Sequence, residues 1–451
     1  MKPKNIAVLL SLLSISILAT AKVTPEEAAR LGKDLTLTGA EAAGNADGSI
    51  PPYTGGSKQG EPPAGKERSI ESYPEIVNDK PLYTITAANM AQYADKLSVG
   101  HQTMLKRFAD YKMDVYETER SSVYPDFYYE ATKKCAVEAE LGNNGDSLVN
   151  AVTGIPFPIP KSGLEIIWNH KVRYRGTGTK RYNTQLAVQT NGDFQAVKLR
   201  EDVRLQYSYP NQKPEDLNNT LIYFMQITTS PARLSGNVLL VHETMDQVKE
   251  PRRAWLYNPG QRRLRRAPNV GYDNPGTGAD GLRTNDQFDV YNGATDRYTW
   301  KVLGKKEMIL PYNAVMLAQD KLKYSDIAKK GHIDQNLARY ELHRVWVVEA
   351  ELKPGVSHLY ARRTFYVDED TWTILHSDIY DRRKELWRIH ESHNVTQTWK
   401  KRFVPVAAAI YDLQSSRYLV MDLSNEEPLY EDKEFALDYY DPANVSKLSA
   451  K

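Results

Sequence analysis

Cysteine is almost absent from this sequence of 451 residues, since Cys135 is its single one. One cysteine allows no disulfide within the chain, so the fold must be held together by burial of side chains. Long apolar runs are missing too. No run reaches the roughly 18 residues of a membrane-spanning helix, which excludes a polytopic membrane protein. With 26 Gly and 24 Pro, the composition also excludes a collagen-like chain.

A strong charge of either sign is equally missing. The chain carries 59 Lys and Arg against 57 Asp and Glu. Such a balance lacks the positive field that nucleic-acid-binding proteins use, so we predict no nucleic-acid partner. Hydrophobic residues make up 41% of the chain, and the length allows either one large domain or two to three smaller ones.

The first 21 residues have the pattern of a secretory signal peptide. Lys2 and Lys4 precede an apolar stretch over 6–19, and the segment 19–21 reads Ala-Thr-Ala. This order of basic, apolar and small residues predicts cleavage after Ala21. No cysteine follows the cleavage site, so a lipid-modified lipoprotein is not expected. A chain so poor in cysteine fits a bacterial periplasm, and we expect a soluble periplasmic protein.

Residues 22–80 are predicted to form a short helix and an extended arm. The segment 24–27, Thr-Pro-Glu-Glu, has the spacing of a capping box, which predicts a helix running to about Leu31. The stretch 39–66 is rich in Gly and Pro and has few bulky apolar side chains, so it cannot fold alone. We predict that this arm packs on the main body.

Residues 81–451 form the predicted main domain, which is mainly β. An apolar stripe over 86–108 predicts an amphipathic helix. After about residue 160 the period of the pattern changes from 3.6 to 2, and strands are expected at 164–174, 182–190, 194–207, 220–229, 236–244, 253–257, 262–266, 298–304, 402–411 and 417–422. Four more form a meander over 341–395.

So many strands in one antiparallel sheet must curl, which predicts an incomplete barrel closed by helices, with 86–108 against its concave face. The apolar face of the meander is then predicted to line a ligand cavity. Two arginines on that face should lie at the cavity mouth or pair with carboxylates, because a buried charge needs a partner. Strand-end arginines reaching solvent are the alternative. The candidate cavity residues are Trp346, Val348, Leu352, Phe365, Arg344 and Arg363.

Two short motifs resemble known sites without their context. The segment 276–281 matches G-x-G-x-x-G, but it follows Asp-Asn-Pro and precedes no helical pattern, which favours a loop over a nucleotide site. His390 and His393 flank Glu391, yet in a strand they point to opposite faces. No nucleophile elbow, P-loop or zinc-type cysteine cluster occurs. We therefore predict no catalytic residue, no metal and no cofactor.

The densest charge lies in a predicted hairpin around the turn Asn258-Pro259-Gly260. Its arms carry several arginines and two aromatic residues, and the candidate contact residues are Trp255, Tyr257, Arg262, Arg263, Arg265 and Arg266. One interpretation is a charged edge that blocks pairing with other chains. The other is a contact for a phosphate head group or an acidic partner.

Three long blocks resemble the bacterial family of domain of unknown function 1329. They are LGKDLTLTGAEAAGNADGSIPPYTGG (31–56), TNDQFDVYNGATDRYTWKVLGKKEMILPYN (284–313) and RRTFYVDEDTWTILHSDIYDRRKELWR (362–388). The hairpin RAWLYNPGQRRLRR (253–266) is also similar to one in outer membrane lipoprotein-sorting proteins, which are periplasmic carriers with an incomplete barrel. The resemblance implies a periplasmic protein that helps a hydrophobic molecule cross the envelope. The insertion at about 267–340 has no counterpart in those shorter carriers.

Three functional hypotheses follow from these observations. The first is a periplasmic carrier or accessory protein that binds a lipid-like hydrophobic molecule. The second is a ligand-free adaptor between a transporter and an outer-membrane protein. The third is a hydrolase of envelope lipid or glycan. The family resemblance implies two further partners, a transporter of the resistance-nodulation-division type and an outer-membrane barrel protein.

Overall fold

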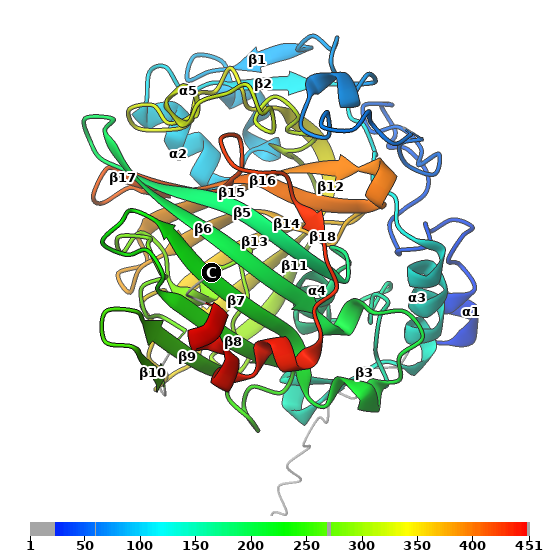
Figure 1. Cartoon of the computed structure of the whole chain (residues 1–451). Coiled ribbons are helices and arrows are strands. Elements are labelled where there is room, and N and C mark those ends of the chain that lie inside the picture. The colour runs from blue at the N-terminus through cyan, green and yellow to red at the C-terminus, as the bar shows by residue number, and fades with distance from the viewer. Residues whose placement is uncertain (1–22, 59, 268–271, 449–451) are drawn as a thin grey trace, which may run out of the picture.

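The computed structural model describes residues 23–58, 60–267 and 272–448 (Figure 1). The predicted signal peptide therefore lies outside the described residues. Sixteen strands form one large sheet. Its main path, in spatial order, is β1 (Tyr83–Ile85), β2 (Met113–Tyr116), β12 (Tyr340–Leu352), β13 (Arg362–Asp368), β14 (Ile374–Tyr380), β15 (Leu386–Gln397), β16 (Arg402–Asp412), β17 (Arg417–Leu423), β5 (Gly178–Val188), β6 (Phe194–Leu205), β7 (Thr220–Ser230), β8 (Val238–Thr244), β9 (Arg253–Asn258) and β10 (Arg263–Arg266).

Two further strands join this sheet beside the main path. β11 (Tyr298–Pro311) pairs with β12, and β18 (Glu431–Asp432) pairs with β5. The strands β3 (Glu140–Gly142) and β4 (Ser147–Val149) form a separate hairpin. All the pairings in the large sheet are antiparallel except that of β12 with β2, which is parallel. The sheet is thus mixed, and the prediction of a purely antiparallel sheet needs this one correction.

The sheet is two consecutive meanders joined side by side. The meander β12–β17 comes from the C-terminal part of the chain and confirms the strands predicted over 341–422. The meander β5–β10 comes from the middle of the chain and pairs with the first through β17 and β5. Because β1 and β10 lie at opposite ends of the path and do not pair, the sheet is not closed into a barrel.

Six α-helices among the described residues lie around the sheet. They are α1 (Pro25–Ala28), α2 (Val99–Arg107), α3 (Asp126–Glu138), α4 (Gly163–Val172), α5 (Tyr324–Ile327) and α6 (Val445–Leu448). The 3₁₀ turns are η1 (Ile70–Ser72), η2 (Met90–Lys96), η3 (Asn143–Gly145), η4 (Gln206–Ser208), η5 (Pro214–Leu217), η6 (Asn285–Gln287), η7 (Thr398–Lys400), η8 (Leu437–Tyr440) and η9 (Pro442–Asn444). No helix among the described residues is both long and apolar enough to cross a membrane.

Helix α4 fills the concave side of the curved sheet. Ile166 and Ile167 pack in one cluster with Phe365 of β13, whereas Trp168 packs in another with Leu221 of β7. The helix therefore touches both meanders, and Figure 1 shows it between β5–β8 and the strands behind them. The prediction of a strand over 164–174 is wrong. Nearly every side chain of α4 is buried, so it has no polar face and its sequence lacks a helical period.

The predicted helix over 86–108 is also corrected in two respects. It consists of η2 and α2, which are separated at Leu97 and Ser98, because the Ser98 side chain caps α2 by accepting a hydrogen bond from the His101 amide. It lies on the face of the sheet opposite to α4, where Met104 and Leu105 pack with Ile389 of β15. The helix that closes the concave face is α4 rather than 86–108.

The insertion predicted at about 267–340 covers both faces of the sheet. Ala279 and Leu282 pack on Leu419 on the concave side. Residues Leu317 and Ile327 pack with Val420 on the other side. Between these two covers the chain forms β11, so the insertion contributes a strand to the sheet as well.

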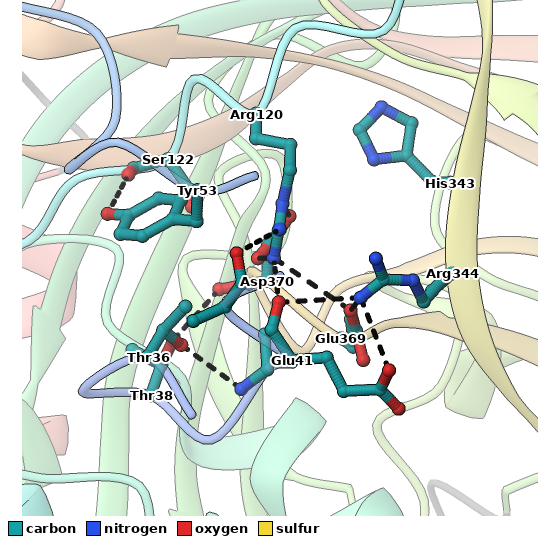
Figure 2. A network of polar contacts seen from close by, with 12 residues as sticks. Thr36, Thr38, Glu41, Tyr53, Arg120, Ser122, His343, Arg344, Glu369 and Asp370 are labelled. Carbon is teal, nitrogen blue, oxygen red and sulfur yellow. Dashed lines mark hydrogen bonds and ion pairs between the residues drawn. The ribbon is translucent and has the colours of Figure 1, made fainter. Parts of the chain in front are cut away.

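The arm is docked on the body, as predicted, by a buried polar network (Figure 2). Arg120 donates two hydrogen bonds to the Asp370 carboxylate, at 2.9 and 2.7 Å, and one of 2.7 Å to the backbone oxygen of Glu41 in the arm. Arg344 donates to the backbone oxygen of Ala43. The Tyr53 hydroxyl donates to the Ser122 backbone oxygen at 2.8 Å. Two arginines of the body thus hold backbone carbonyls of the arm.

Candidate ligand cavity

A cavity of about 150 Å³ lies on the concave side of the sheet and is partly open to solvent. Strands β5 to β8 form one wall, and β16, β17 and the segment 277–292 form the rest. The cavity therefore lies where the two meanders meet, beside the space that α4 fills. A concave site at the junction of two halves of a fold is a common position for small-molecule binding.

One wall of the cavity is apolar because of the strand period. Alternate residues of β6, β7 and β8 point to the same face of the sheet, so each strand contributes two apolar side chains. These six are Val203, Leu205, Ile222, Phe224, Leu239 and Val241. The three central members, Ile222, Phe224 and Leu239, are only half-buried. This wall offers apolar surface to a ligand.

The lining of the cavity is also strongly basic. Five arginines line the cavity, against three carboxylates, and they are Arg175, Arg181, Arg252, Arg283 and Arg402. Four of them are neutralised by ion pairs to Asp289, Glu201, Glu243 and Asp432, at 2.8, 2.6, 2.7 and 2.8 Å respectively. The fifth, Arg283, is different.

Arg283 is a buried cation without a carboxylate partner. Arg283 is 5% exposed, and within the part of the chain that the structure describes its guanidinium makes one hydrogen bond, of 3.3 Å, to the backbone oxygen of Thr284. Within the described residues no carboxylate oxygen lies within 4 Å of its guanidinium, and its Nε has no hydrogen-bond partner. Burial lowers the pKa of Arg283, as expected for a desolvated cation. Such a group is what an anionic ligand would neutralise.

The carboxylates near the cavity already form ion pairs with arginines of the protein. Burial opposes the ionisation of Asp289, but the guanidinium groups of Arg173 and Arg175 hold its pKa well below the usual range. Burial raises the pKa of Asp422, although Arg181 opposes this shift. Both carboxylates therefore belong to ion pairs of the protein. The charges of Asp422 and Glu201 also act on Arg283 and oppose the fall of its pKa, but among the described residues neither carboxylate forms an ion pair with its guanidinium.

Comparison with known proteins places the chain in a family. The family model described as "Protein of unknown function (DUF1329)" matches residues 84–446. The protein belongs to this family. "Uncharacterized protein PA3922" of Pseudomonas aeruginosa is 51% identical to it over 437 residues, which cover 95% of this chain and 94% of the relative.

Two solved structures are also similar to this DUF1329 protein. A crystal structure assigned to an outer membrane lipoprotein-sorting protein domain from Vibrio parahaemolyticus is 13% identical, with a TM-score of 0.43, and covers 63% of this chain and 98% of its own. A DUF1329 family protein from Desulfovibrio piger is 15% identical, with a TM-score of 0.40, and covers 60% of this chain and 92% of its own.

The cavity residues predicted from the meander lie elsewhere in this DUF1329 protein. Val348 and Phe365 are fully buried in the cluster that α4 covers, with Leu352 and Trp346 partly buried at its edge. They face the concave side but do not line the cavity described above. Whether they contact a ligand stays a prediction.

The two arginines of that face are paired with carboxylates, which was one of the predicted alternatives. Arg363 is fully buried and bound to Asp286, and it also donates to the Tyr298 hydroxyl at 3.1 Å. Arg344 lies 3.1 Å from the Glu369 carboxylate. Both are therefore neutralised within the protein.

The basic hairpin forms as predicted from β9 and β10, with Arg263 opposite Asn258. Tyr257 is buried and Trp255 packs against His242, with 4.8 Å between the ring centroids. β10 is the last strand of the sheet, and its arginines are exposed. Within the described residues no ion pair is formed by Arg262, Arg263, Arg265 or Arg266. This arrangement fits a charged sheet edge, and a partner contact stays a prediction.

Proposed function

We propose that this DUF1329 protein is a periplasmic carrier of an amphiphile that has an acidic head group. The observation that supports this proposal is the pairing of an apolar wall with the unpaired, buried Arg283 in one cavity. A buried cation without a partner destabilises the folded protein by several kcal/mol, so its retention suggests a use in binding. A carboxylate, phosphate or sulfate would accept its hydrogen bonds.

The size of the cavity limits how such a ligand is bound. An apolar cavity of about 150 Å³ holds a molecule the size of benzene. The head group and the first part of the tail would therefore occupy the space near Arg283. A longer tail would extend along Phe224 and Leu239 towards solvent, or would require the two meanders to move apart.

The chemistry of the wall favours binding over catalysis. Among the described residues that line the cavity there is no Ser, Cys or His, and its carboxylates, Glu243, Asp289 and Asp422, are held in ion pairs with arginines. We therefore place the hydrolase hypothesis below the carrier. The adaptor hypothesis can be distinguished from the carrier hypothesis only by a binding experiment. Under both hypotheses we propose a transporter and an outer-membrane protein as partners.

The proposal is tested by ligand loading of the purified full-length protein. Native mass spectrometry with lipid extraction identifies any amphiphile that copurifies, and a fluorescent fatty acid measures binding to stripped protein. Arg283→Met removes the head-group contact, and a charge-assisted hydrogen bond of about 1.5–3 kcal/mol corresponds to a loss of affinity of about tenfold or more. Leu239→Trp should block the apolar wall.

Two matched controls carry the same changes outside the cavity. Leu256→Trp lies on β9, where Leu256 is 48% exposed, and Arg263→Met lies on the exposed edge strand. Both should bind the probe as wild type does. Arg283→Met should also raise the melting temperature of the ligand-free protein, because it removes an unpaired buried charge. Wild-type protein that binds no acidic amphiphile at micromolar concentration would refute the carrier and favour the adaptor.

A further inference from the structure

A cluster of histidines lies on the other face of the sheet, under α2. His101 of α2, His376 of β14 and Glu391 of β15 are each 0% exposed. One nitrogen of each imidazole and one carboxylate oxygen of Glu391 lie within 4.8 Å of one another. The rings of His101 and His376 are 4.2 Å apart between centroids. Three elements distant in sequence thus bring metal-binding groups to one point.

The contacts around the cluster orient its side chains. Nε2 of His376 lies 2.8 Å from the Asp378 carboxylate and 2.8 Å from the Ser98 hydroxyl, and its Nδ1 has no hydrogen-bond partner among the described residues. Oε1 of Glu391 lies 2.8 Å from Nε2 of His101 and also accepts hydrogen bonds from the hydroxyls of Tyr111 and Tyr340, at 3.4 and 3.2 Å, whereas Oε2 has no hydrogen-bond partner among the described residues. An imidazole held by a carboxylate on its far nitrogen is the usual arrangement of a metal-binding histidine.

Several buried polar atoms of this cluster have no partner among the described residues. They are Nδ1 of His101, Nδ1 of His376, Oε2 of Glu391 and both ring nitrogens of His393. His393 is also 0% exposed, and its Nε2 lies 3.9 Å from Oε2 of Glu391. Buried polar atoms are nearly always satisfied in native proteins, so such a concentration of unsatisfied atoms in one place calls for a ligand.

We propose that His101, His376 and Glu391 bind a divalent transition-metal ion, with Zn²⁺ as the expected metal. Two imidazoles and a carboxylate are ligands that Zn²⁺ accepts, whereas Mg²⁺ and Ca²⁺ prefer oxygen ligands alone. The ion would fasten α2 to β14 and β15.

The motif over 390–393 explains why the sequence did not reveal the site. His390 faces the cavity side, because it lies opposite Ile410, which packs with the concave-side residues. It therefore cannot join His393, as predicted from the strand period. The residue of the motif that meets the other two ligands is Glu391, and these ligands come from β14 and from α2, with His101 separated from the motif by most of the chain.

The test is the metal content of the full-length protein, purified with an affinity tag that contains no histidine. Inductively coupled plasma mass spectrometry should find one zinc per chain. After removal with a chelator, Zn²⁺ should rebind with a dissociation constant below about 1 μM, the range of structural zinc sites. Excess Zn²⁺ should raise the melting temperature by about 5 °C. Co²⁺ in its place should give the visible absorption of a tetrahedral ion.

His376→Gln is the decisive variant, because it removes the ligand that β14 contributes to the cluster. It should weaken Zn²⁺ binding at least tenfold and abolish the tetrahedral Co²⁺ spectrum, and His101→Gln should do the same. The matched control is His242→Gln, which changes a buried histidine bound to the Tyr440 backbone oxygen outside the cluster. Its zinc content should equal that of wild type. Folded wild-type protein that takes up no Zn²⁺ would overturn the site, and so would binding that survives both substitutions in the cluster.

Discussion

Replacing Arg120 by methionine should release the arm from the body. The Arg120 side chain is 3% exposed and forms a bidentate ion pair with Asp370, which is equally buried. It also holds the backbone oxygen of Glu41, and its guanidinium lies 5.4 Å from the ring centre of Tyr53. Methionine keeps the length of the side chain but makes none of these polar contacts. The other arginine at the arm, Arg344, remains in place.

The expected loss follows from the charge that is left behind. Removing one partner of a buried ion pair destabilises a protein by about 3–5 kcal/mol, because the remaining charge is uncompensated. Glu369 keeps Lys305 and Arg344 as partners, so Asp370 alone is stranded. If the free energy that docks the arm on the body decreases by about 3 kcal/mol, the population in which the arm is detached increases about 150-fold.

Hydrogen exchange measured by mass spectrometry detects this opening. The amides of Ala42 and Tyr53 are bonded within the arm, to the backbone oxygens of Asp34 and Ala42. Peptides over 35–57 should exchange about 100-fold faster in Arg120→Met, while peptides of β13–β16 stay protected. Adding Asp370→Asn should restore much of the protection. The control Arg383→Met, at a side chain that is 68% exposed, should change nothing. Wild-type exchange of the arm in Arg120→Met would refute the role given to this ion pair.

Three further predictions concern the core, the acidic turn and export. Phe365→Ala removes a fully buried ring and should lower the free energy of unfolding in urea by about 3–5 kcal/mol. Burial and the neighbouring Asp370 raise the pKa of Asp368 to about 7. Between about pH 4 and 7 the Asp368 carboxyl is therefore protonated in the folded protein but ionised in the unfolded chain, so the free energy of unfolding falls as the pH rises from about 4 to 7. Asp368→Asn should flatten this fall in urea titrations at pH 5 and 8, and an unchanged slope would contradict the shift. N-terminal sequencing of the exported protein should begin at Lys22, and retention of Met1 would contradict the signal peptide.

The strands of the fold could be predicted from the sequence far better than the helices. Alternating apolar residues marked β6 and the meander β12–β15 almost residue by residue, because each of these strands has one face more polar than the other. The residues of helix α4 were predicted to be a strand, because the run Ile166-Ile167-Trp168 is buried on all sides and has no helical period. The position of 86–108 was also wrong, since an amphipathic pattern tells which side chains are buried but not on which face of a sheet.

The cavity and the histidine cluster could not be predicted from the sequence, because their residues come together only in the fold. Arg283 stands in an irregular segment, and nothing around it indicates that no carboxylate will reach it in the fold. The carboxylates of Arg175 and Arg181 come from Asp289 and Glu201, which only the fold brings together. Local motifs find sites whose ligands are close in sequence, and neither the cavity nor the histidine cluster is of this kind.

The joining of β5 to β17 has a consequence for how the chain reaches its native state. β5 ends at Val188, but its neighbour begins only at Arg417, near the end of the polypeptide. Until β17 has been synthesised, the edge of β5 that will pair with it has unpaired backbone N–H and C=O groups. Such an edge can pair with strands of other chains. Pairings between residues so distant in sequence also form slowly. Newly made protein should therefore depend on chaperones until its last strands arrive, and a chain truncated before β17 should aggregate rather than fold.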